Sequence, residues 1–126
     1  MSGLINSAGS KSGVIGEIIE TGTNANGEYT KFKDGTLICK NDLQSNSSAD
    51  VTWTFPHAFS GTGSRSGPSG HPACGGTSYD SADRWNVPGD SPFISTTSWK
   101  FRCWIASSSP GRSSSGQMLT AIGYLK

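Results

Sequence analysis

The stretch NANGEYTKFKDGTLIC, residues 24–39, decides the fold of this chain. Strand-forming residues run from Tyr29 to Lys33 and again from Thr36 to Lys40, and Asp34-Gly35 lies between the two runs. Asp-Gly in this position is a strong hairpin signal, because a two-residue type I′ turn needs positive φ at both central residues. We therefore predict an antiparallel β-hairpin with a type I′ turn at Asp34-Gly35.

Other segments extend the β pattern over the rest of the chain. Residues 14–21 (VIGEIIET) are strand-prone, residues 21–27 form a turn cluster, and residues 51–55 and 98–106 alternate apolar with polar side chains. Residues 117–125 (QMLTAIGYL) are apolar on both faces, which indicates a strand inside the assembly. Because no segment has a capped helical period, we predict an all-β fold, a small antiparallel β-sandwich of roughly five to eight strands.

The chain divides into a short arm and one domain. Residues 1–13 (MSGLINSAGSKSG) are predicted as an extended N-terminal arm, and residues 14–126 as the sandwich. Within the domain, residues 60–92 are rich in Gly, Ser and Pro and are predicted as a long loop. A loop of this length in a compact domain is usually functional. The alternative is that it contains a poorly patterned pair of strands.

Composition and charge exclude several classes of function. Of 126 residues, 33% are hydrophobic and 17 are Gly, so a single copy has a thin core that an oligomer would help to stabilise. The net charge of +1, without a basic run, gives no broad attraction for nucleic acid or acidic lipid. We see neither an apolar stretch of membrane-spanning length nor a secretory signal, and we expect synthesis in a cytoplasm and no membrane insertion.

The cysteine and histidine residues do not form a recognisable reactive or metal-binding motif. The three cysteines are odd in number and widely spaced, so we expect all of them to be reduced, with a Cys74–Cys103 bridge as the alternative. Cys74 lies near His71, but no helix is predicted there that would lower the pKa of the thiol. His57 and His71 are the only histidines. We therefore predict no catalytic residue, no metal and no cofactor.

The long loop carries the best candidates for a binding surface. A glycosidase would need two carboxylates across a sugar bond, but the aspartates of this loop are more simply explained as turn residues. Aromatic rings with adjacent carboxylate and guanidinium groups suit sugars, which stack on the rings and form bidentate hydrogen bonds. Alternatively, Tyr79 and Trp85 anchor the loop onto the sheet. Trp104 is a further candidate, either for binding or for a subunit interface. The candidate binding residues are Tyr79, Asp80, Asp83, Arg84 and Trp85.

Two phrases of the sequence also resemble a known family. The hairpin phrase at residues 24–39 is followed by TWTFPHAF at residues 52–59, and the chain closes with AIGYLK at residues 121–126. Together these are similar to the C-terminal tip domain of bacteriophage and prophage tail-fibre proteins. The resemblance stops at SGTGSRSGPSG, residues 60–70, where family members tend to continue into an apolar strand.

The resemblance implies a trimeric β-structured knob in the virion that contacts a glycan or a protein on the surface of the host bacterium. It implies a homotrimer, attachment to other virion proteins through the N-terminal arm, and no enzymatic activity. The alternatives are a capsid decoration or tail-assembly protein that stabilises the particle, and a hydrolase of capsule polysaccharide. The apolar residues expected to dock the arm onto the virion are Leu4, Ile5, Val14 and Ile15.

Overall fold

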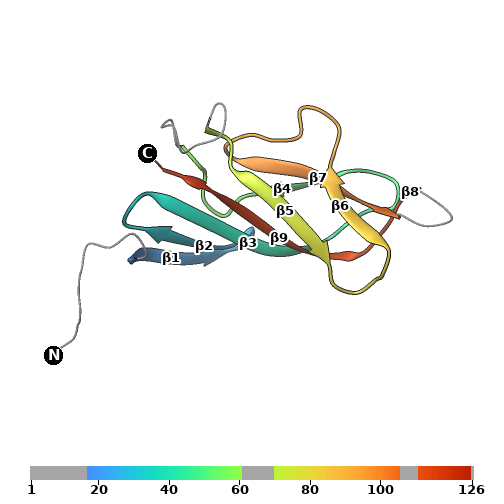
Figure 1. Ribbon diagram of the computed structural model, residues 1–126, viewed down its shortest axis with the longest axis horizontal. Coiled ribbons are helices and arrows are strands. Elements are labelled where there is room, and N and C mark those ends of the chain that lie inside the picture. Colours follow the sequence, from blue (N-terminus) through green and yellow to red (C-terminus); the bar gives the residue numbers. More distant parts are fainter. Residues whose placement is uncertain (1–16, 61–69, 106–110, 126) are drawn as a thin grey trace.

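The computed structural model describes residues 17–60, 70–105 and 111–125. These residues form nine strands and no α-helix, arranged as two antiparallel sheets (Figure 1), which confirms the all-β prediction and is consistent with a β-sandwich. The described residues include no helix of the length and apolarity needed to cross a membrane. The predicted arm, residues 1–13, and the four candidate docking residues lie outside the described residues.

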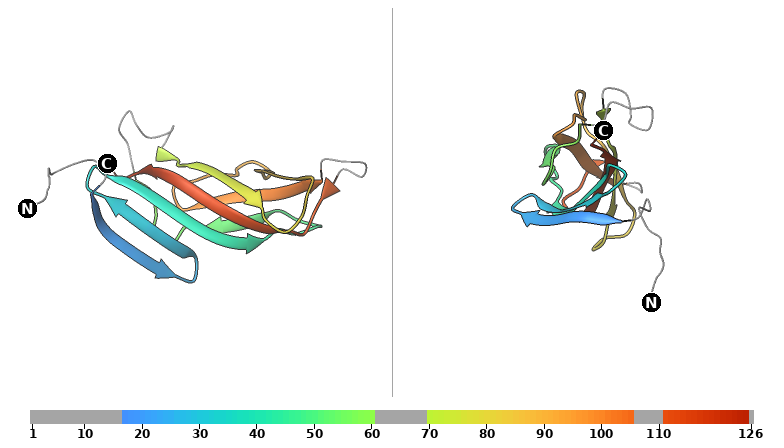
Figure 2. Two further views of the ribbon diagram at one scale, coloured as in Figure 1. Left: turned by 60° about the horizontal axis from the view of Figure 1, so that its bottom comes forward. Right: turned by 90° about the vertical axis from the view of Figure 1, so that its left-hand side faces the viewer.

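Sheet A, the larger of the two sheets, has five strands in the order β1-β2-β3-β9-β5. Sheet B has four strands: three follow the order β4-β7-β6, and the short strand β8 also pairs with β7. Figure 2 shows the two sheets as two layers, with the β1–β2 hairpin extending past sheet B. The strands of sheet A are β1 (Ile18–Asn24), β2 (Gly27–Phe32), β3 (Thr36–Gln44), β9 (Gly116–Tyr124) and β5 (Ala73–Ser78). Those of sheet B are β4 (Val51–Thr54), β7 (Ser98–Ile105), β6 (Arg84–Pro88) and β8 (Gly111–Arg112).

The opening hairpin is confirmed, but its predicted turn type is wrong. Strand β2 pairs with β3 in antiparallel register, as expected. The turn is longer than two residues, because the Gly35 N–H donates to the Phe32 carbonyl at 3.0 Å. Gly35 has a φ of 96°, whereas Asp34 is not among the residues of positive φ. This is the three-residue type of hairpin turn with a glycine bulge, and the Asp34 carboxylate favours it by accepting the Thr36 N–H at 2.9 Å.

The turn cluster predicted at residues 21–27 is also wrong, because strand β1 continues through most of it. Asn24 pairs with Gly27, so the turn contains only the two residues between them. Gly22, which suggested a break in the strand, lies instead beneath the ring of Tyr29. A Cβ at Gly22 would lie 2.5 Å from that ring, so the strand needs glycine here for close packing.

The long predicted loop at residues 60–92 contains two strands, β5 and β6, which is the alternative noted above. Part of the segment, residues 61–69, lies outside the described residues. Strand β5 has the sequence ACGGTS, which has no alternation of large apolar residues. Glycine is required in it, because a Cβ at Gly76 would lie 2.8 Å from Leu119 and 2.7 Å from Asn86.

The final strand, β9, is an interior strand of sheet A, since it lies between β3 and β5. Its inner face is buried, with Leu119 and Ala121 at 1% and 0% exposure. Its outer face is not covered in a single chain, because Met118 and Ile122 are 50% and 45% exposed. The strand is therefore confirmed, and its outer face is open among the described residues.

The hydrophobic core is dominated by aromatic rings between the two sheets. Trp53 and Phe55 meet edge to face at 5.1 Å, and Phe55 meets Phe59 in the same way at 5.2 Å. The indole N–H of Trp53 donates to the Asn26 carbonyl at 2.8 Å, which ties sheet B to the first hairpin. The buried core residues are Leu37, Cys39, Trp53, Phe55, Phe59, Trp99, Phe101, Leu119 and Ala121.

The interior near the start of β9 is polar instead of aromatic. Gln117 is completely buried and accepts a hydrogen bond from Asn86 at 2.9 Å. The buried hydroxyl of Ser45 donates to the Ser113 carbonyl at 2.6 Å and accepts the Ser115 N–H at 2.8 Å. These contacts satisfy polar groups that would otherwise be costly to bury.

Candidate functional site

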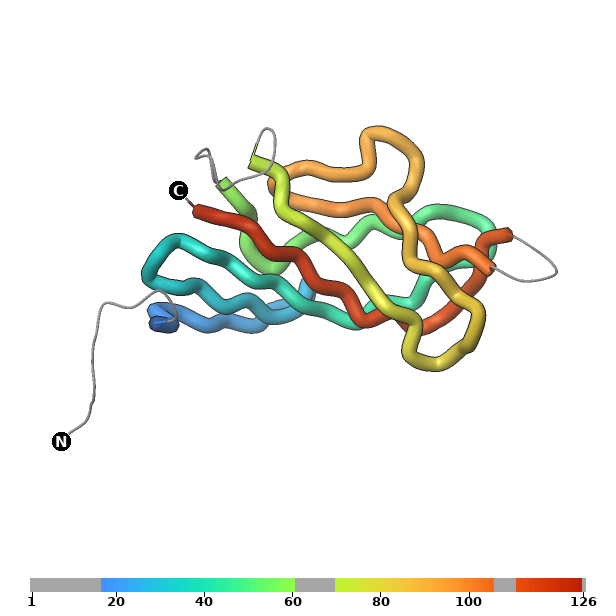
Figure 3. Tube along the Cα trace, in the orientation of Figure 1, coloured from blue at the N-terminus to red at the C-terminus, as the bar shows by residue number. Residues whose placement is uncertain are grey.

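The candidate binding residues lie where the chain passes from one sheet to the other. Residues 79–83 connect β5 of sheet A to β6 of sheet B. This connection lies at the end of the molecule opposite to the start of β1 and the end of β9 (Figure 1), and the Cα trace shows it as a wide turn (Figure 3). A contact made by this turn is therefore remote from the N-terminal side of the domain.

Asp80 has a structural role in this turn. Its carboxylate accepts the Ser115 hydroxyl at 2.7 Å and the Gly116 N–H at 3.0 Å. These two hydrogen bonds lower the pKa of Asp80 below its ordinary value, and the bond from Ser115 has the larger effect. Asp80 therefore fixes the turn to the beginning of β9.

Arg84 fixes the other end of the same turn. Its Nε donates to the Ser113 hydroxyl at 2.9 Å, and its Nη1 donates to the Ala82 carbonyl at 2.9 Å. Asp83, just before it, has a φ of 56°, in the left-handed region that Asp tolerates better than most residues. The guanidinium group of Arg84, which we expected to bind a ligand, thus forms hydrogen bonds within the protein.

The two aromatic candidates lie against different sheets, and only Trp85 belongs to a strand. The ring of Tyr79 lies over Gly116 of sheet A, where a Cβ would be 2.5 Å from it. Trp85 is in β6 of sheet B, and its neighbour Asn86 faces inward toward Gln117. Since side chains alternate along a strand, Trp85 faces outward. The five predicted residues therefore do not form one surface, although Tyr79 and Trp85 are 57% and 60% exposed.

Trp85 is instead part of a row across the outer face of sheet B. It pairs directly with Trp104 of β7, and Trp104 pairs on its other side with Arg112 of β8. Directly paired residues project from the same face of a sheet. We call Trp85, Trp104 and Arg112 the tryptophan row. It places two indole rings and one guanidinium group side by side, and Trp104 is the partner of Trp85.

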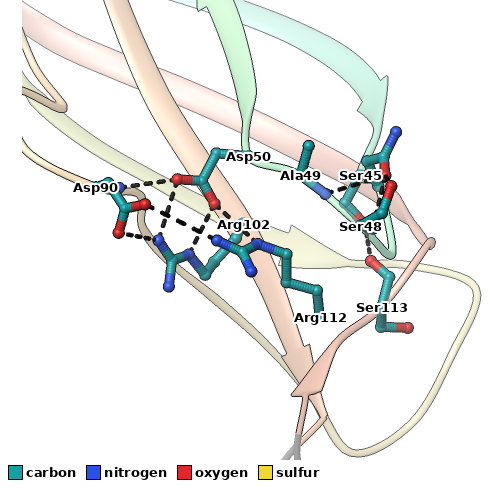
Figure 4. A network of polar contacts seen from close by, with 9 residues as sticks. Ser45, Ser48, Ala49, Asp50, Asp90, Arg102, Arg112 and Ser113 are labelled. Carbon is teal, nitrogen blue, oxygen red and sulfur yellow. Dashed lines mark hydrogen bonds and ion pairs between the residues drawn. The ribbon is translucent and has the colours of Figure 1, made fainter.

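A network of ion pairs fixes this face of sheet B (Figure 4). Asp50 accepts two hydrogen bonds from Arg102, at 2.8 Å from Nε and 3.0 Å from Nη2. It also accepts a bond at 3.1 Å from Nε of Arg112, the last member of the tryptophan row. Asp90 completes the network with a contact of 2.6 Å to Arg102. The four residues come from four separate segments, so the network joins β4, β7, β8 and the connection after β6.

The environment of Asp50 is set by two opposing effects. Burial alone would raise its pKa, since only 9% of its side chain is exposed. Hydrogen bonds from Arg102, from the backbone of Asp90 and from Arg112 outweigh burial and lower the pKa of Asp50 to about 2. The two carboxylates and two guanidinium groups of the network have no net charge together. Their polar side chains lie beside the tryptophan row and are held in place by the ion pairs.

Other concave or reactive features are less suited to recognition. A groove of about 460 Å³ on the outer face of sheet A is lined by Glu28, Lys40, Asp42 and Met118, among others, but by no aromatic ring. Within the described ranges no three His, Cys, Asp or Glu side chains gather closely enough to hold a metal ion. Burial raises the pKa of Cys74 to about 12, the opposite of an activated thiol.

The three cysteines are free, and they lie in different environments. Cys39 and Cys74 both flank Ala121 in sheet A, one on each side of β9. Cys103 is in sheet B and completely buried. The alternative bridge between Cys74 and Cys103 is therefore not formed.

Comparison with known proteins gives no relative. No family model, no curated protein and no solved structure matches this chain. What can be said of function therefore rests on the residues themselves.

Proposed function

We propose that this chain is a virion structural protein of a bacteriophage, the tip of a tail or head fibre that binds the surface of the host bacterium. The receptor is a surface glycan or an outer-membrane protein. The resemblance of the opening hairpin and of the TWTFPHAF segment to fibre tips supports the proposal. The all-β fold is consistent with such a tip.

The observation that carries the proposal is the tryptophan row on sheet B. Trp85 is 60% exposed and has Trp104 and Arg112 in line beside it, so it is part of a row and not a singly exposed side chain. Tryptophan and arginine are the residues that most often dominate binding energy. The ion pairs of Asp50 hold the strands beneath the row, so that little conformational entropy is lost when a ligand binds.

The placement of the chain ends is also consistent with a fibre tip. The described chain begins and ends at one end of the sandwich, and the turn at residues 79–83 lies at the other (Figure 1). In the proposed virion, the N-terminal arm docks onto neighbouring virion proteins through Leu4, Ile5, Val14 and Ile15. The opposite end is then free to meet the host.

We further propose that the tip is a homotrimer. A single copy leaves Met118 and Ile122 of β9 half exposed, although β9 is an interior strand of sheet A. Contact between copies would remove this aliphatic surface from water at about 25 cal/mol per Å². Closed rotational symmetry is the usual way in which identical chains achieve such burial.

The test is binding of the fluorescently labelled protein to a panel of bacterial strains, measured by flow cytometry. In strains that bind the wild type, Trp85→Ala should weaken binding at least ~10-fold, because an anchoring tryptophan contributes ~2 kcal/mol or more. Trp85→Phe should retain part of the binding because it keeps an aromatic face. Glu28→Ala is the control, since its side chain is exposed on sheet A and belongs neither to the row nor to the proposed contacts between copies.

Equal binding by Trp85→Ala and wild type would refute the assignment of the row as the receptor contact. Deletion of the gene from the phage separates the adhesin from a particle-stabilising role. Particles that assemble but do not adsorb support the proposal, and particles that fall apart support the decoration or assembly role.

A further inference from the structure

The exposed hydrophobic residues of this chain fall into two chemically distinct groups. Among the described residues, the large exposed aliphatic side chains all lie in sheet A: Ile18, Ile19, Met118 and Ile122. The large exposed aromatic side chains all lie between residues 79 and 93: Tyr79, Trp85 and Phe93. The aromatic group fits ligand recognition, and the aliphatic group requires a different explanation.

Strand β1 is the most exposed element of sheet A. It is the edge of the sheet, and six of its seven residues are exposed. Figure 2 shows that the first hairpin extends past sheet B, which leaves the inner side of β1 uncovered as well. Its one charged side chain, Glu20, is held within the hairpin by Tyr29 at 2.6 Å and Lys31 at 3.1 Å. A bulge interrupts the register at Ile19, but residues 20–24 pair regularly with β2. This part of the edge is a strand whose charge is already compensated, which is a template for pairing with another strand.

The opposite edge of sheet A, strand β5, complements β1. It has the sequence ACGGTS, with no charged residue, and its length of six residues is close to the seven of β1. A Cβ at Gly75 would meet no atom within 4 Å, so the outer side of this strand is open. Unlike β1, strand β5 lies over sheet B, since Gly76 meets Asn86 of β6.

We propose that the β1 edge of one copy pairs with the β5 edge of a second copy. This inference rests on the proposed homotrimer and names an edge contact that would form it, which is separate from the exposed outer face of β9. The five strands of sheet A are all antiparallel, so β1 and β5 run in the same direction and lie on opposite sides of the sheet. Such a head-to-tail contact repeats from copy to copy, and it closes into the proposed trimer when each copy is rotated by one third of a turn from the last. In this arrangement β1, which extends past its own sheet B, lies beside the edge of sheet B of the neighbouring copy. That neighbouring sheet covers Ile19.

The pairing pattern identifies the residue that tests this contact. Asn24 and Gly27 close a two-residue turn, so they exchange both hydrogen bonds of their pair. Bonded and non-bonded pairs then alternate along the hairpin, which makes Thr21 and Thr30 a non-bonded pair. The Thr21 N–H therefore points to the free edge. Proline at residue 21 removes that donor and leaves the bonds between β1 and β2 in place.

The experiment measures the mass of the full chain in solution by light scattering and sedimentation. We expect the wild type and Thr21→Ala to have three times the 13.2 kDa mass of the chain, and Thr21→Pro to have the mass of one chain. Ile19→Lys, which places a charge on the same edge, should also be monomeric. Circular dichroism and tryptophan fluorescence show whether each variant is folded.

The possible outcomes separate this inference from the proposed function. If folded Thr21→Pro and Ile19→Lys both remain trimeric, the β1 edge is not the contact and the inference is overturned. A wild-type dimer also overturns it, because an edge pairing with itself is a two-fold contact. A wild-type monomer overturns both the edge contact and the trimer. In each case the role of Trp85 in cell binding is still decided by the cell-binding assay.

Discussion

Asp50 offers the sharpest test of what holds sheet B together. The substitution is Asp50→Asn, which keeps the shape of the side chain and removes its charge. The variant leaves the guanidinium groups of Arg102 and Arg112 next to each other, without the carboxylate that both contact at 2.8 and 3.1 Å. We expect a folded but less stable protein, because removing one member of a partly buried ion pair leaves its partners uncompensated.

The magnitude follows from the pKa of Asp50. Hydrogen bonding lowers that pKa from 3.8 to about 2 against the opposing effect of burial. A difference of this size corresponds to about 2.4 kcal/mol, since one pH unit is worth about 1.36 kcal/mol. The two arginine side chains keep 18% and 28% exposure, so solvent screens part of the interaction. We therefore expect Asp50→Asn to lose about 1–2 kcal/mol of unfolding free energy at pH 7.

The pH dependence has a definite sign. A carboxyl group whose pKa is lower in the folded state stabilises the fold above the unfolded pKa of 3.8. That contribution is lost as the pH falls through about 2. The unfolding free energies of wild type and Asp50→Asn should therefore differ most above about pH 5 and converge toward pH 2.

Urea denaturation followed by tryptophan fluorescence, repeated between neutral and acidic pH, measures these differences. Asp90→Asn is the matched control, because Asp90 contacts the same Arg102 but is 76% exposed, and we expect a loss below about 1 kcal/mol. If Asp50→Asn is within about 0.5 kcal/mol of wild type at pH 7, or if the difference does not change with pH, the reasoning is wrong.

Three further predictions test the core. Trp53→Ala should lose ~3–5 kcal/mol in urea denaturation, because the side chain is 1% exposed, and a loss below ~2 kcal/mol would contradict its place in the core. Gly76→Ala should lose ~1–3 kcal/mol because its Cβ would lie 2.8 Å from Leu119, whereas Gly75→Ala meets no atom within 4 Å and should stay within ~0.5 kcal/mol in thermal melts. Similar melting temperatures for the two variants would refute this contrast. Burial raises the pKa of Cys74 to about 12, so iodoacetamide at pH 8 should label it much more slowly in the native protein than in urea, as mass spectrometry would show.

The parts of the fold that sequence predicted correctly have a local signal. The hairpin of residues 24–39 carries its own turn chemistry, and residues 51–55 and 98–106 alternate with the period of a strand. Strand β5 has no such signal, because its inner position at Gly76 is filled by side chains from other strands. Its place in the sheet is set by tertiary contacts, which local patterning does not record.

The candidate site was predicted only in part, for a geometric reason. Asp80 to Trp85 are close in sequence, and in a loop they would share one surface. Because β6 begins at Arg84, alternation directs Arg84 away from the face that carries Trp85. The network around Asp50 had no local signal, since Asp50 and Arg102 are 52 residues apart in the chain.

The turn at residues 79–83 is attached in a way that bears on protein engineering. Asp80 and Arg84 hold its two ends through Ser113, Ser115 and Gly116, and neither contact involves the aromatic core. Residues between the two anchors can therefore be exchanged or lengthened at a modest entropic cost of about 0.6 kcal/mol per doubling of loop length. A foreign peptide grafted between Asp80 and Arg84 would be displayed at the end of the molecule remote from the start of β1 and the end of β9 (Figure 1).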